Sequence, residues 1–407
     1  SPLHKLTREQ ENARDLIIQK VSKALENGER QQLIFIDGEA GTGKTVLNSS
    51  TFYELYCQAE GKKEKLNCYL LVNHDEQIIV YEQIAEKLGL VERYGKVVSK
   101  PTTFINNHSE SDPADVVFID EAHLLLTQGK QSYRGENQLK DIIDRARVTV
   151  VMFDENQILT TEQFWEDQIL EKYRNQAKKA NNYIVLDKQL RMQADSETID
   201  WIDSFTKKGQ LKKIPHTCGG YTIKIFDDPE LLDIEIKRRA DQSDSALSRV
   251  VATYDWEYSK RHKPEERTKK YWEVYVGKWH KPWNRELESE LTGKEKQNIK
   301  RLAWAEQPQT INEIGSTFTI QGFDLNYVGV ILGPSVKYRD GKIIFDPSES
   351  HNDKAIRNRT LSDGTKHKFG EKLIQHEVRV LMTRGVNGMY IYACDPELRA
   401  ALLKASE

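Results

Sequence analysis

Eight consecutive residues near the start of the chain have the composition of a phosphate-binding loop. Residues 38–45 read Gly-Glu-Ala-Gly-Thr-Gly-Lys-Thr and fit the pattern GxxxxGK[ST]. Glycines let successive backbone N–H groups turn toward one anion, and a following helix presents its positive N-terminus to that anion. We expect Lys44 to reach the β and γ phosphates of a nucleotide and Thr45 to ligate Mg²⁺. The other candidate phosphate-binding residues are Gly38, Gly41, Thr42 and Gly43.

Two neighbouring carboxylates follow a hydrophobic run later in the chain. Residues 116–119 are Val-Val-Phe-Ile, and Asp120 and Glu121 come directly after them. At the end of a buried strand, Asp120 can hold hydrated Mg²⁺ while Glu121 polarises an attacking water. Adjacent acidic residues also cap helices. Because a kinase of small molecules needs no water-activating glutamate, the pair favours hydrolysis over phosphoryl transfer to a metabolite.

Alternating apolar strands and helices would position these residues. One apolar run directly precedes the glycine-rich loop, and a helical stretch directly follows it. Nearly continuous apolar strands separated by helices indicate a parallel sheet with both faces covered. The strands expected in this first series span 32–36, 69–72, 116–119 and 148–153, and the helices span 6–25, 46–58 and 76–88.

A second series of the same kind begins after about residue 163. Its expected strands span 184–186, 222–225, 327–331 and 389–392, and its expected helices span 230–239, 294–302, 372–382 and 396–404. We therefore predict an α/β fold of two parallel-sheet domains, 1–162 and 163–407. The second domain contains an insertion at about 255–310, where the alternation of strands and helices is interrupted. Residues 347–370 are predicted to form a polar loop.

Composition narrows the classes of protein. Among the 407 residues, 60 Lys and Arg face 63 Asp and Glu, so any affinity for nucleic acid must come from local patches. No apolar run approaches the ~18 residues of a membrane span. The four cysteines (Cys57, Cys68, Cys218 and Cys394) form no CxxC pair, which favours a cytoplasmic protein. The chain begins without Met, which leaves open an additional N-terminal domain or a protein partner.

Seven motifs, in this order along the chain, resemble those of superfamily 1 helicase-type P-loop ATPases. They lie at residues 6–10, 71–75, 102–104, 153–157, 186–191, 317–324 and 380–385. Phe153 stands where that family usually has Gly. The letters Asp-Glu-Ala-His at 120–123 suggest superfamily 2, but its closing QxxGRxGR motif is absent and Thr383-Arg384 is present. Within superfamily 1 the chain most resembles the Schlafen-like group of DNA/RNA helicases, through 189–192, 256–258 and the run from Thr319.

This resemblance implies two RecA-like domains with a cleft between them, ATP and Mg²⁺ as cofactors, and single-stranded DNA or RNA as partner. It implies that Gln10 reads adenine and that Asp154 and Gln157 belong to the nucleotide site, with Gln157 sensing the γ-phosphate. Arg191 and Arg384 would neutralise charge in the transition state. Gln321 and Gly322 would couple the nucleotide to the bound strand, supported by Asp324.

The tryptophan-rich segment and His123 each fit more than one role. Residues 256–284 contain four tryptophans among lysines and arginines. Such a segment can stack on bases of a single strand, at about 1–3 kcal/mol each, or its aromatic rings can pack on the second sheet. His123 can relay between the nucleotide and the second domain or cap a turn. His74 reads as an ordinary loop histidine.

The predicted function is an ATP-hydrolysing motor on nucleic acid, a helicase or a single-strand translocase whose ATPase is stimulated by nucleic acid. The alternative is a regulatory ATPase switch that remodels a complex without unwinding. A scaffold with little turnover is disfavoured because Glu121 is intact.

Overall fold

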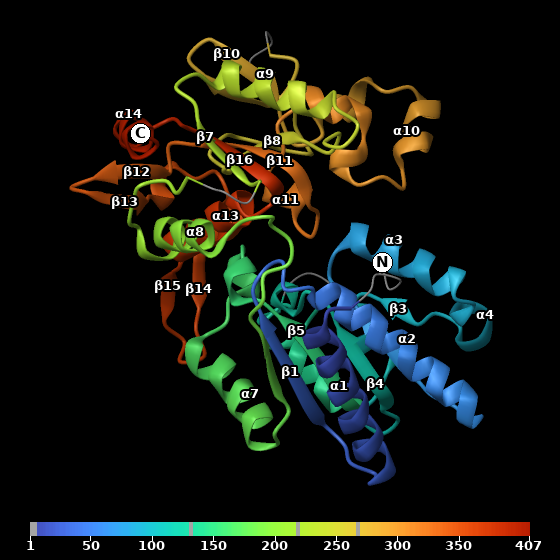
Figure 1. Cartoon of the computed structure of the whole chain (residues 1–407). Helices are drawn as coiled ribbons and strands as arrows, with labels where there is room; N and C mark the ends of the chain where they lie inside the picture. Colours follow the sequence, from blue (N-terminus) through green and yellow to red (C-terminus); the bar gives the residue numbers. More distant parts are fainter. Residues whose placement is uncertain (1–5, 130–132, 217–219, 266–268) are drawn as a thin grey trace. The chain divides into compact units, whose positions relative to one another are not determined.

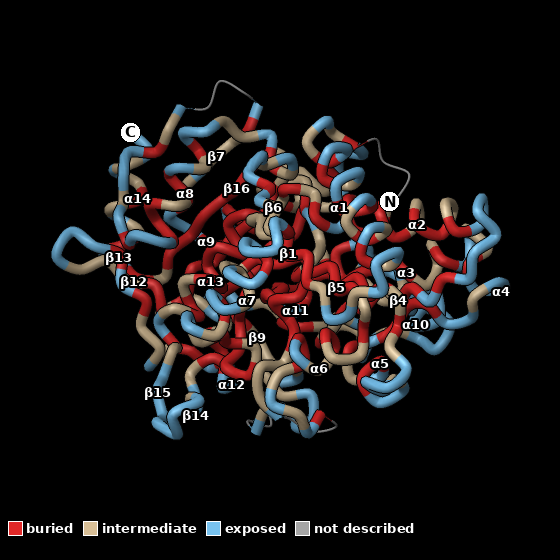
Figure 2. The backbone as a smooth tube through the Cα atoms, turned by 90° about the horizontal axis from the view of Figure 1, so that it is seen from below, coloured by how far each residue is buried: buried red, intermediate tan, exposed pale blue. Residues whose placement is uncertain are grey.

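The computed structural model describes residues 6–129, 133–216, 220–265 and 269–407 (Figure 1). Contacts between Cα atoms divide the chain into two compact units, Ser1–Leu190 and Arg191–Glu407. Each unit contains a parallel sheet whose central strands are buried along most of their length (Figure 2). Among the described residues, no helix combines the length and apolar character needed to span a bilayer.

The first unit is built on a six-stranded sheet with the order β3-β2-β4-β5-β1-β6. Every pairing in it is parallel, so the carboxyl ends of its strands lie along one edge. The strands are β1 (Gln32–Gly38), β2 (Cys68–Leu71), β3 (Val98–Ser99), β4 (Ala114–Ile119), β5 (Ala146–Phe153) and β6 (Tyr183–Leu186).

Helices cover both faces of this sheet, which is why its strands are apolar on both sides. Ile34 and Ile36 of β1 pack in one core with residues of α1 and α2, which lie in front of the sheet in Figure 1. Phe35 points to the other face, where it contacts Phe153. The helices are α1 (Arg8–Glu26), α2 (Lys44–Lys62), α3 (Asp75–Lys87), α4 (Leu90–Tyr94), α5 (Pro101–Asn107), α6 (Gln138–Asp144) and α7 (Asp167–Lys179).

The second unit is built on a four-stranded parallel sheet with the order β7-β16-β11-β8. Its strands are β7 (Thr222–Ile225), β8 (Arg249–Ala252), β11 (Leu325–Leu332) and β16 (Gly385–Ala393). Val330 and Ile391 are fully buried in the core of this sheet. The helices are α8 (Ser196–Lys208), α9 (Pro229–Ala240), α10 (Gly293–Ile299), α11 (Thr317–Ile320), α12 (Asp353–Ile356), α13 (Gly370–Met382) and α14 (Pro396–Ala405).

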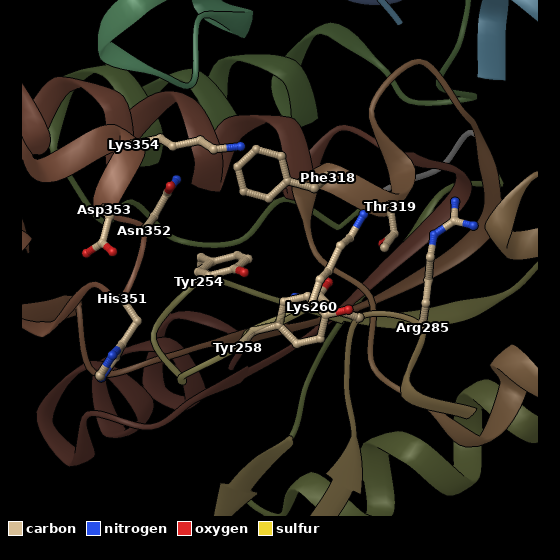
Figure 3. Close-up of a pocket in the computed structure, with 11 residues that line it drawn as sticks. Tyr254, Tyr258, Lys260, Arg285, Phe318, Thr319, His351, Asn352, Asp353 and Lys354 are labelled. Carbon is tan, nitrogen blue, oxygen red and sulfur yellow. The ribbon is translucent and has the colours of Figure 1, made fainter. Parts of the chain in front are cut away.

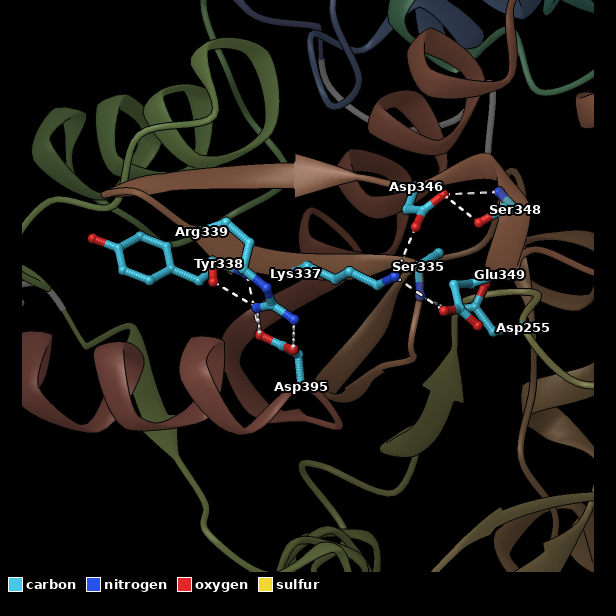
Figure 4. A network of polar contacts seen from close by, with 9 residues as sticks. All are labelled: Asp255, Ser335, Lys337, Tyr338, Arg339, Asp346, Ser348, Glu349 and Asp395. Atoms are coloured by element: carbon cyan, nitrogen blue, oxygen red, sulfur yellow. Dashed lines mark hydrogen bonds and ion pairs between the residues drawn. The ribbon is translucent and has the colours of Figure 1, made fainter.

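Antiparallel hairpins extend the second unit. They are β9–β10 (Glu273–Val276 and Trp279–Pro282), β12–β13 (Val336–Arg339 and Lys342–Phe345) and β14–β15 (Asn358–Thr360 and Lys366–Lys368). Ion pairs fasten β12 to its surroundings (Figure 4). Arg339 binds Asp395, the N-cap of α14, at 2.8 Å. Lys337 contacts Asp346 at 2.7 Å and is the main cause that lowers the pKa of Asp346 to about 2.

The predicted elements of both series are present, but their division differs. The strand at 184–186 was assigned to the second series, and this assignment is wrong, because β6 pairs with β1 at the edge of the first sheet. Along the chain, the boundary between the two compact units falls between Leu190 and Arg191, whereas the predicted boundary lies between residues 162 and 163. The predicted loop at 347–370 contains α12 and the β14–β15 hairpin.

The tryptophan-rich segment is packed against the second unit's core. Trp256 and Trp283 are 4% and 0% exposed and share a cluster with Phe226 and Ile331, while Trp272 and Trp279 pack against that cluster. Of the two readings, the structure supports packing for these rings. Residues 266–268, including one of the predicted cations, and Cys218 lie outside the described residues.

Candidate active site

The glycine-rich loop of the first unit joins β1 to α2. Gly41 and Gly43 have φ of 86° and 80°, a backbone region that favours glycine. A Cβ atom added at Gly43 would lie 1.9 Å from Nε2 of Gln10. The backbone at position 43 therefore favours glycine, and any side chain there would displace the amide of Gln10.

The side chain of Lys44 is buried within this loop. Its Nζ donates to the carbonyls of Gly38 at 2.6 Å and Glu39 at 2.8 Å. It also lies 3.9 Å from Oδ2 of Asp154, a residue that is 2% exposed. The ammonium group thus sits inside the curve of the loop, opposite the carboxylate at the end of β5.

Thr45 and Asp120 are brought together at the ends of α2 and β4. Asp120 is 1% exposed and accepts hydrogen bonds from Tyr81 Oη and from the side chain of Thr45. Burial, and then the charge of Glu121, raise the pKa of Asp120 to about 6. A buried carboxylate whose charge is disfavoured, beside a hydroxyl, is a donor set that suits Mg²⁺.

Glu121 has a left-handed backbone conformation, and two neighbouring side chains contact its carboxylate. Its φ is 49°, in the left-handed region that a residue with a side chain rarely adopts. Gln77 Nε2 donates to its Oε1 at 3.3 Å, and His123 Nε2 lies 3.1 Å from its Oε2. His123 is fully buried. Strained backbone conformations of this kind cluster at functional sites.

The residues that follow β5 form a small polar cluster. Gln157 Nε2 donates to Asp154 Oδ2 at 2.8 Å, and Asp154 Oδ1 accepts from the backbone of Asn156 at 3.1 Å. Asn156 Nδ2 in turn donates to Glu39 Oε1 in the glycine-rich loop at 3.3 Å. The predicted pair of Asp154 and Gln157 is therefore connected to the loop by a third residue.

Both chain ends of the first unit contact the loop. Gln10 is 4% exposed, which excludes an ordinary exposed glutamine, and its Nε2 donates to the carbonyl of Gly43 at 3.4 Å. Its Oε1 accepts from the backbone of Thr7 at 2.9 Å, completing a capping box at the start of α1. At the other end of the unit, the backbone of Leu190 donates to the carbonyl of Gly41 at 2.7 Å.

The candidate residues of the second unit gather around one segment. Arg191 Nε lies 2.5 Å from Asp324 Oδ1. Arg384 is fully buried, its Nη1 donates to the carbonyl of Phe323 at 3.4 Å, and its own carbonyl accepts from the backbone of Leu325. The same segment contains Gln321, which is 7% exposed, and Gly322, whose φ is 82°.

Three site residues were missed from the sequence. Tyr81 and Gln77 come from α3, and Asn156 comes from the turn after β5. Tyr81 and Gln77 touch the motif carboxylates because the fold brings α3 to the residues that follow β4, and no local pattern signals that contact. Asn156 lies inside a recognised motif, so its position between Asp154 and Gln157 was a usable signal.

Comparison with known families settles the broad class. The profile described as Schlafen group 3, DNA/RNA helicase domain, matches residues 31–395. The chain belongs to this family. Schlafen group 3 membership confirms the predicted resemblance and identifies the chain as an ATP-driven motor of helicase type that acts on nucleic acid.

Individual proteins that resemble this chain share 30% sequence identity or less with it. The uncharacterised protein YPL245W of Saccharomyces cerevisiae is 30% identical over 436 residues, which cover 99% of this chain and 91% of that protein. A crystal structure of Pif1 helicase from Candida albicans is similar at 15% identity and a TM-score of 0.26, covering 59% of this chain and 55% of that one. A structure of two coordinating Pif1 helicases at forked DNA gives 11% identity, a TM-score of 0.36, and coverage of 97% and 94%.

Proposed function

We propose that the first unit binds Mg²⁺-ATP and hydrolyses it, and that a single strand of DNA or RNA stimulates the hydrolysis. One observation carries the proposal. Lys44, Thr45, Asp120 and Glu121 converge at the carboxyl ends of β1 and β4, although the two pairs are far apart in the sequence. This is the arrangement that phosphate binding, metal binding and water activation require together.

Thr45 and Asp120 would hold the metal ion. When bound, Mg²⁺ supplies positive charge that stabilises the phosphate oxygens in the transition state. Tyr81 acts as a positioning residue, because its hydroxyl donates to Asp120 and limits the orientations of the carboxylate. Lys44 would exchange its bonds to the Gly38 and Glu39 carbonyls for bonds to phosphate oxygens.

Glu121 would accept the proton of the attacking water. Its carboxylate is oriented from two sides, by the amide of Gln77 and by the imidazole of His123. Two such partners restrict the carboxylate to one rotamer, which is what a general base needs in order to meet a water in line. His123 therefore serves Glu121 in this proposal, in place of a relay to the other unit.

The remaining residues would report on the nucleotide. The cluster of Asp154, Asn156 and Gln157 touches the loop at Glu39, so a change at the γ-phosphate would reach the end of β5. Gln10 would meet the adenine from its place beside Gly43. Arg191 and Arg384 would neutralise charge in the transition state, and Gln321 and Gly322 would couple the nucleotide to the strand.

The test is an ATPase assay of the full chain with single-stranded DNA, single-stranded RNA or no strand. We expect one or both strands to raise the rate, and Lys44→Ala to lower the stimulated rate by at least about 10²-fold. Lys278→Ala is the matched control, because Lys278 is exposed in the β9–β10 turn. Hydrolysis that no strand stimulates would contradict the proposal and favour the regulatory switch.

A further inference from the structure

The second unit contains a cavity of about 360 Å³ that the proposed ATPase site does not use (Figure 3). It lies between the loop after β8, the turn at Asn284, α11 and the start of α12. Aromatic rings, cations and amides from these four segments line it. The residues that line it include Tyr254, Tyr258, Lys260, Asn284, Arg285, Phe318 and Lys354.

Aromatic rings form one side of the cavity. Tyr254 and Phe318 meet edge to face with ring centroids 5.4 Å apart, and Tyr258 lines the cavity beside them. Phe318 is 38% exposed, which is unusual for a phenylalanine. Two contacts fix the position of Tyr254. Its ring packs on Trp283 with centroids 5.0 Å apart, and its backbone N–H donates to Glu377. A fixed ring beside an exposed ring offers a stacking surface.

An unpartnered hydrogen-bond donor lies in the cavity wall. Asn284 is 5% exposed, and its Oδ1 accepts from Ser316 Oγ at 2.7 Å. Its Nδ2 is buried without a hydrogen-bond partner among the described residues. Asn284 and Arg285 also have consecutive left-handed φ values of 54° and 71°. Asn284 lines the cavity from this strained turn, and its buried amide donor costs about 1–3 kcal/mol unless a ligand that reaches it accepts its hydrogen bond.

Positive charge dominates the rim. Lys260, Arg285 and Lys354 all line the cavity, against a single carboxylate from Asp353. Lys354 Nζ lies 5.4 Å from the centroid of the Phe318 ring, and Figure 3 shows its side chain reaching toward that ring. Rings flanked by cations match a nucleotide, whose base is flat and whose phosphate is anionic.

We propose that this cavity binds one nucleotide of the single strand, with its base against Phe318 and Tyr254. The base accepts a hydrogen bond from Asn284 Nδ2, and Lys260, Arg285 and Lys354 hold the neighbouring phosphates. This inference rests on the proposed strand-dependent ATPase and adds to it the place where a base is held. Backbone contacts alone would need neither the rings nor the buried amide.

The cavity is also connected to the residues that respond to the nucleotide. Phe318 lies in α11, and Gln321 and Gly322 follow that helix directly. Two residues further on, Asp324 pairs with Arg191. A base that displaces Phe318 therefore moves a helix that ends at the proposed coupling residues.

The experiment compares two single strands of equal length, about 12 nucleotides, within the site sizes of single-strand binders. One strand carries bases and the other carries abasic sites, and both are followed by fluorescence anisotropy with the full chain. We expect Phe318→Ala to weaken binding of the base-containing strand by about 5- to 150-fold and to change binding of the abasic strand much less. Lys354→Ala should weaken both strands and reduce the salt dependence by about one counterion. Lys278→Ala should change neither.

The outcomes separate the two proposals. If the unaltered chain binds neither strand, the proposed function fails. If it binds strands and Phe318→Ala loses no affinity, or loses equal affinity for both strands, the cavity inference alone is overturned.

Asn284→Asp tests the cavity independently, because aspartate tolerates the left-handed backbone and keeps the acceptor for Ser316 but removes the donor. A photoreactive thiopyrimidine strand should cross-link the unaltered chain at Tyr254, Tyr258 or Phe318, and cross-links confined to other regions would also overturn it.

Discussion

Arg191 and Asp324 form an ion pair of 2.5 Å inside the second unit. The pair joins the first residue of that unit to the segment that follows α11. The side chain of Arg191 is 15% exposed and that of Asp324 is 46% exposed. A pair with one solvated partner contributes little to stability, about 0–1 kcal/mol. Its consequence is therefore orientation, because it fixes the direction of the Arg191 guanidinium.

Replacing Arg191 tests whether that guanidinium acts in hydrolysis. Arg191→Ala should lower the strand-stimulated kcat by about 10³-fold, because arginines that meet transition-state charge contribute that much. Its melting temperature should change little. Arg238→Ala is the control, since Arg238 is 54% exposed and pairs with Glu235 on the surface of α9. Steady-state ATPase with thermal unfolding distinguishes the cases, and an unchanged kcat would remove Arg191 from the site.

Tyr81 should matter for metal use. In Tyr81→Phe the carboxylate of Asp120 loses its phenolic donor, so we expect a higher half-saturating Mg²⁺ concentration and a loss of about 1.5–3 kcal/mol in unfolding free energy. A Mg²⁺ titration of the ATPase gives the first quantity and denaturant unfolding the second. Tyr69→Phe is the control, because Tyr69 packs on Phe104 and His108 instead. An identical Mg²⁺ curve would contradict the positioning role.

Glu377 makes stability depend on pH. Burial, followed by the charge of Asp255, raises the pKa of Glu377 from 4.5 to about 8. The folded chain therefore keeps this carboxyl protonated where the unfolded chain has ionised it. Its contribution is full below about pH 4.5 and is lost as pH rises toward about 8, at no more than about 1.4 kcal/mol per pH unit.

Glu377→Gln removes this titration and keeps an oxygen for the Tyr254 backbone N–H. As pH rises from about 5 to about 8, we expect the melting temperature of the variant to increase relative to that of the unaltered chain. Parallel curves for the two proteins over that range would show that Glu377 titrates normally.

The buried tryptophans of the 256–284 segment should contribute to stability as core residues do. Trp283 is fully buried, so Trp283→Ala should cost about 3–5 kcal/mol in unfolding free energy. Tyr275→Ala in the same segment should cost less than about 0.5 kcal/mol, because Tyr275 is 58% exposed. Denaturant unfolding measures both. Equal, small effects would mean that these rings are placed for a strand instead of for packing.

The sequence predicted what is local and missed what depends on tertiary contacts. The loop around Lys44 was predictable because its residues are contiguous and because an apolar strand and a helix flank them. Tyr81 was not predictable as a site residue, since its contact with Asp120 joins residues that are far apart in the sequence and depends on tertiary packing. The functional class followed from the order of the motifs, which tertiary packing does not alter.

Strand assignment shows the same limit. Tyr183–Leu186 pairs with β1 through a crossover, and nothing in a parallel strand's own sequence states which sheet it joins. β8 was not predicted; it opens with a charged residue, Arg249, which is nevertheless buried and bonded to Thr310. The composition of 256–284 fits stacking and packing equally, so only the burial of Trp256 and Trp283 decided between them.

The central claim is that ATP hydrolysis at Lys44 and Glu121 drives movement on a single strand. The most direct test is the ATPase rate at saturating concentrations of single strands of increasing length, with Glu121→Gln as the blank for contaminating activity. A motor that steps along its strand predicts a rate that rises with strand length toward a plateau, and a variant that binds ATP but hydrolyses it about 10²–10⁴-fold more slowly. A rate that is independent of strand length, or a Glu121→Gln variant as active as the unaltered chain, would contradict the claim.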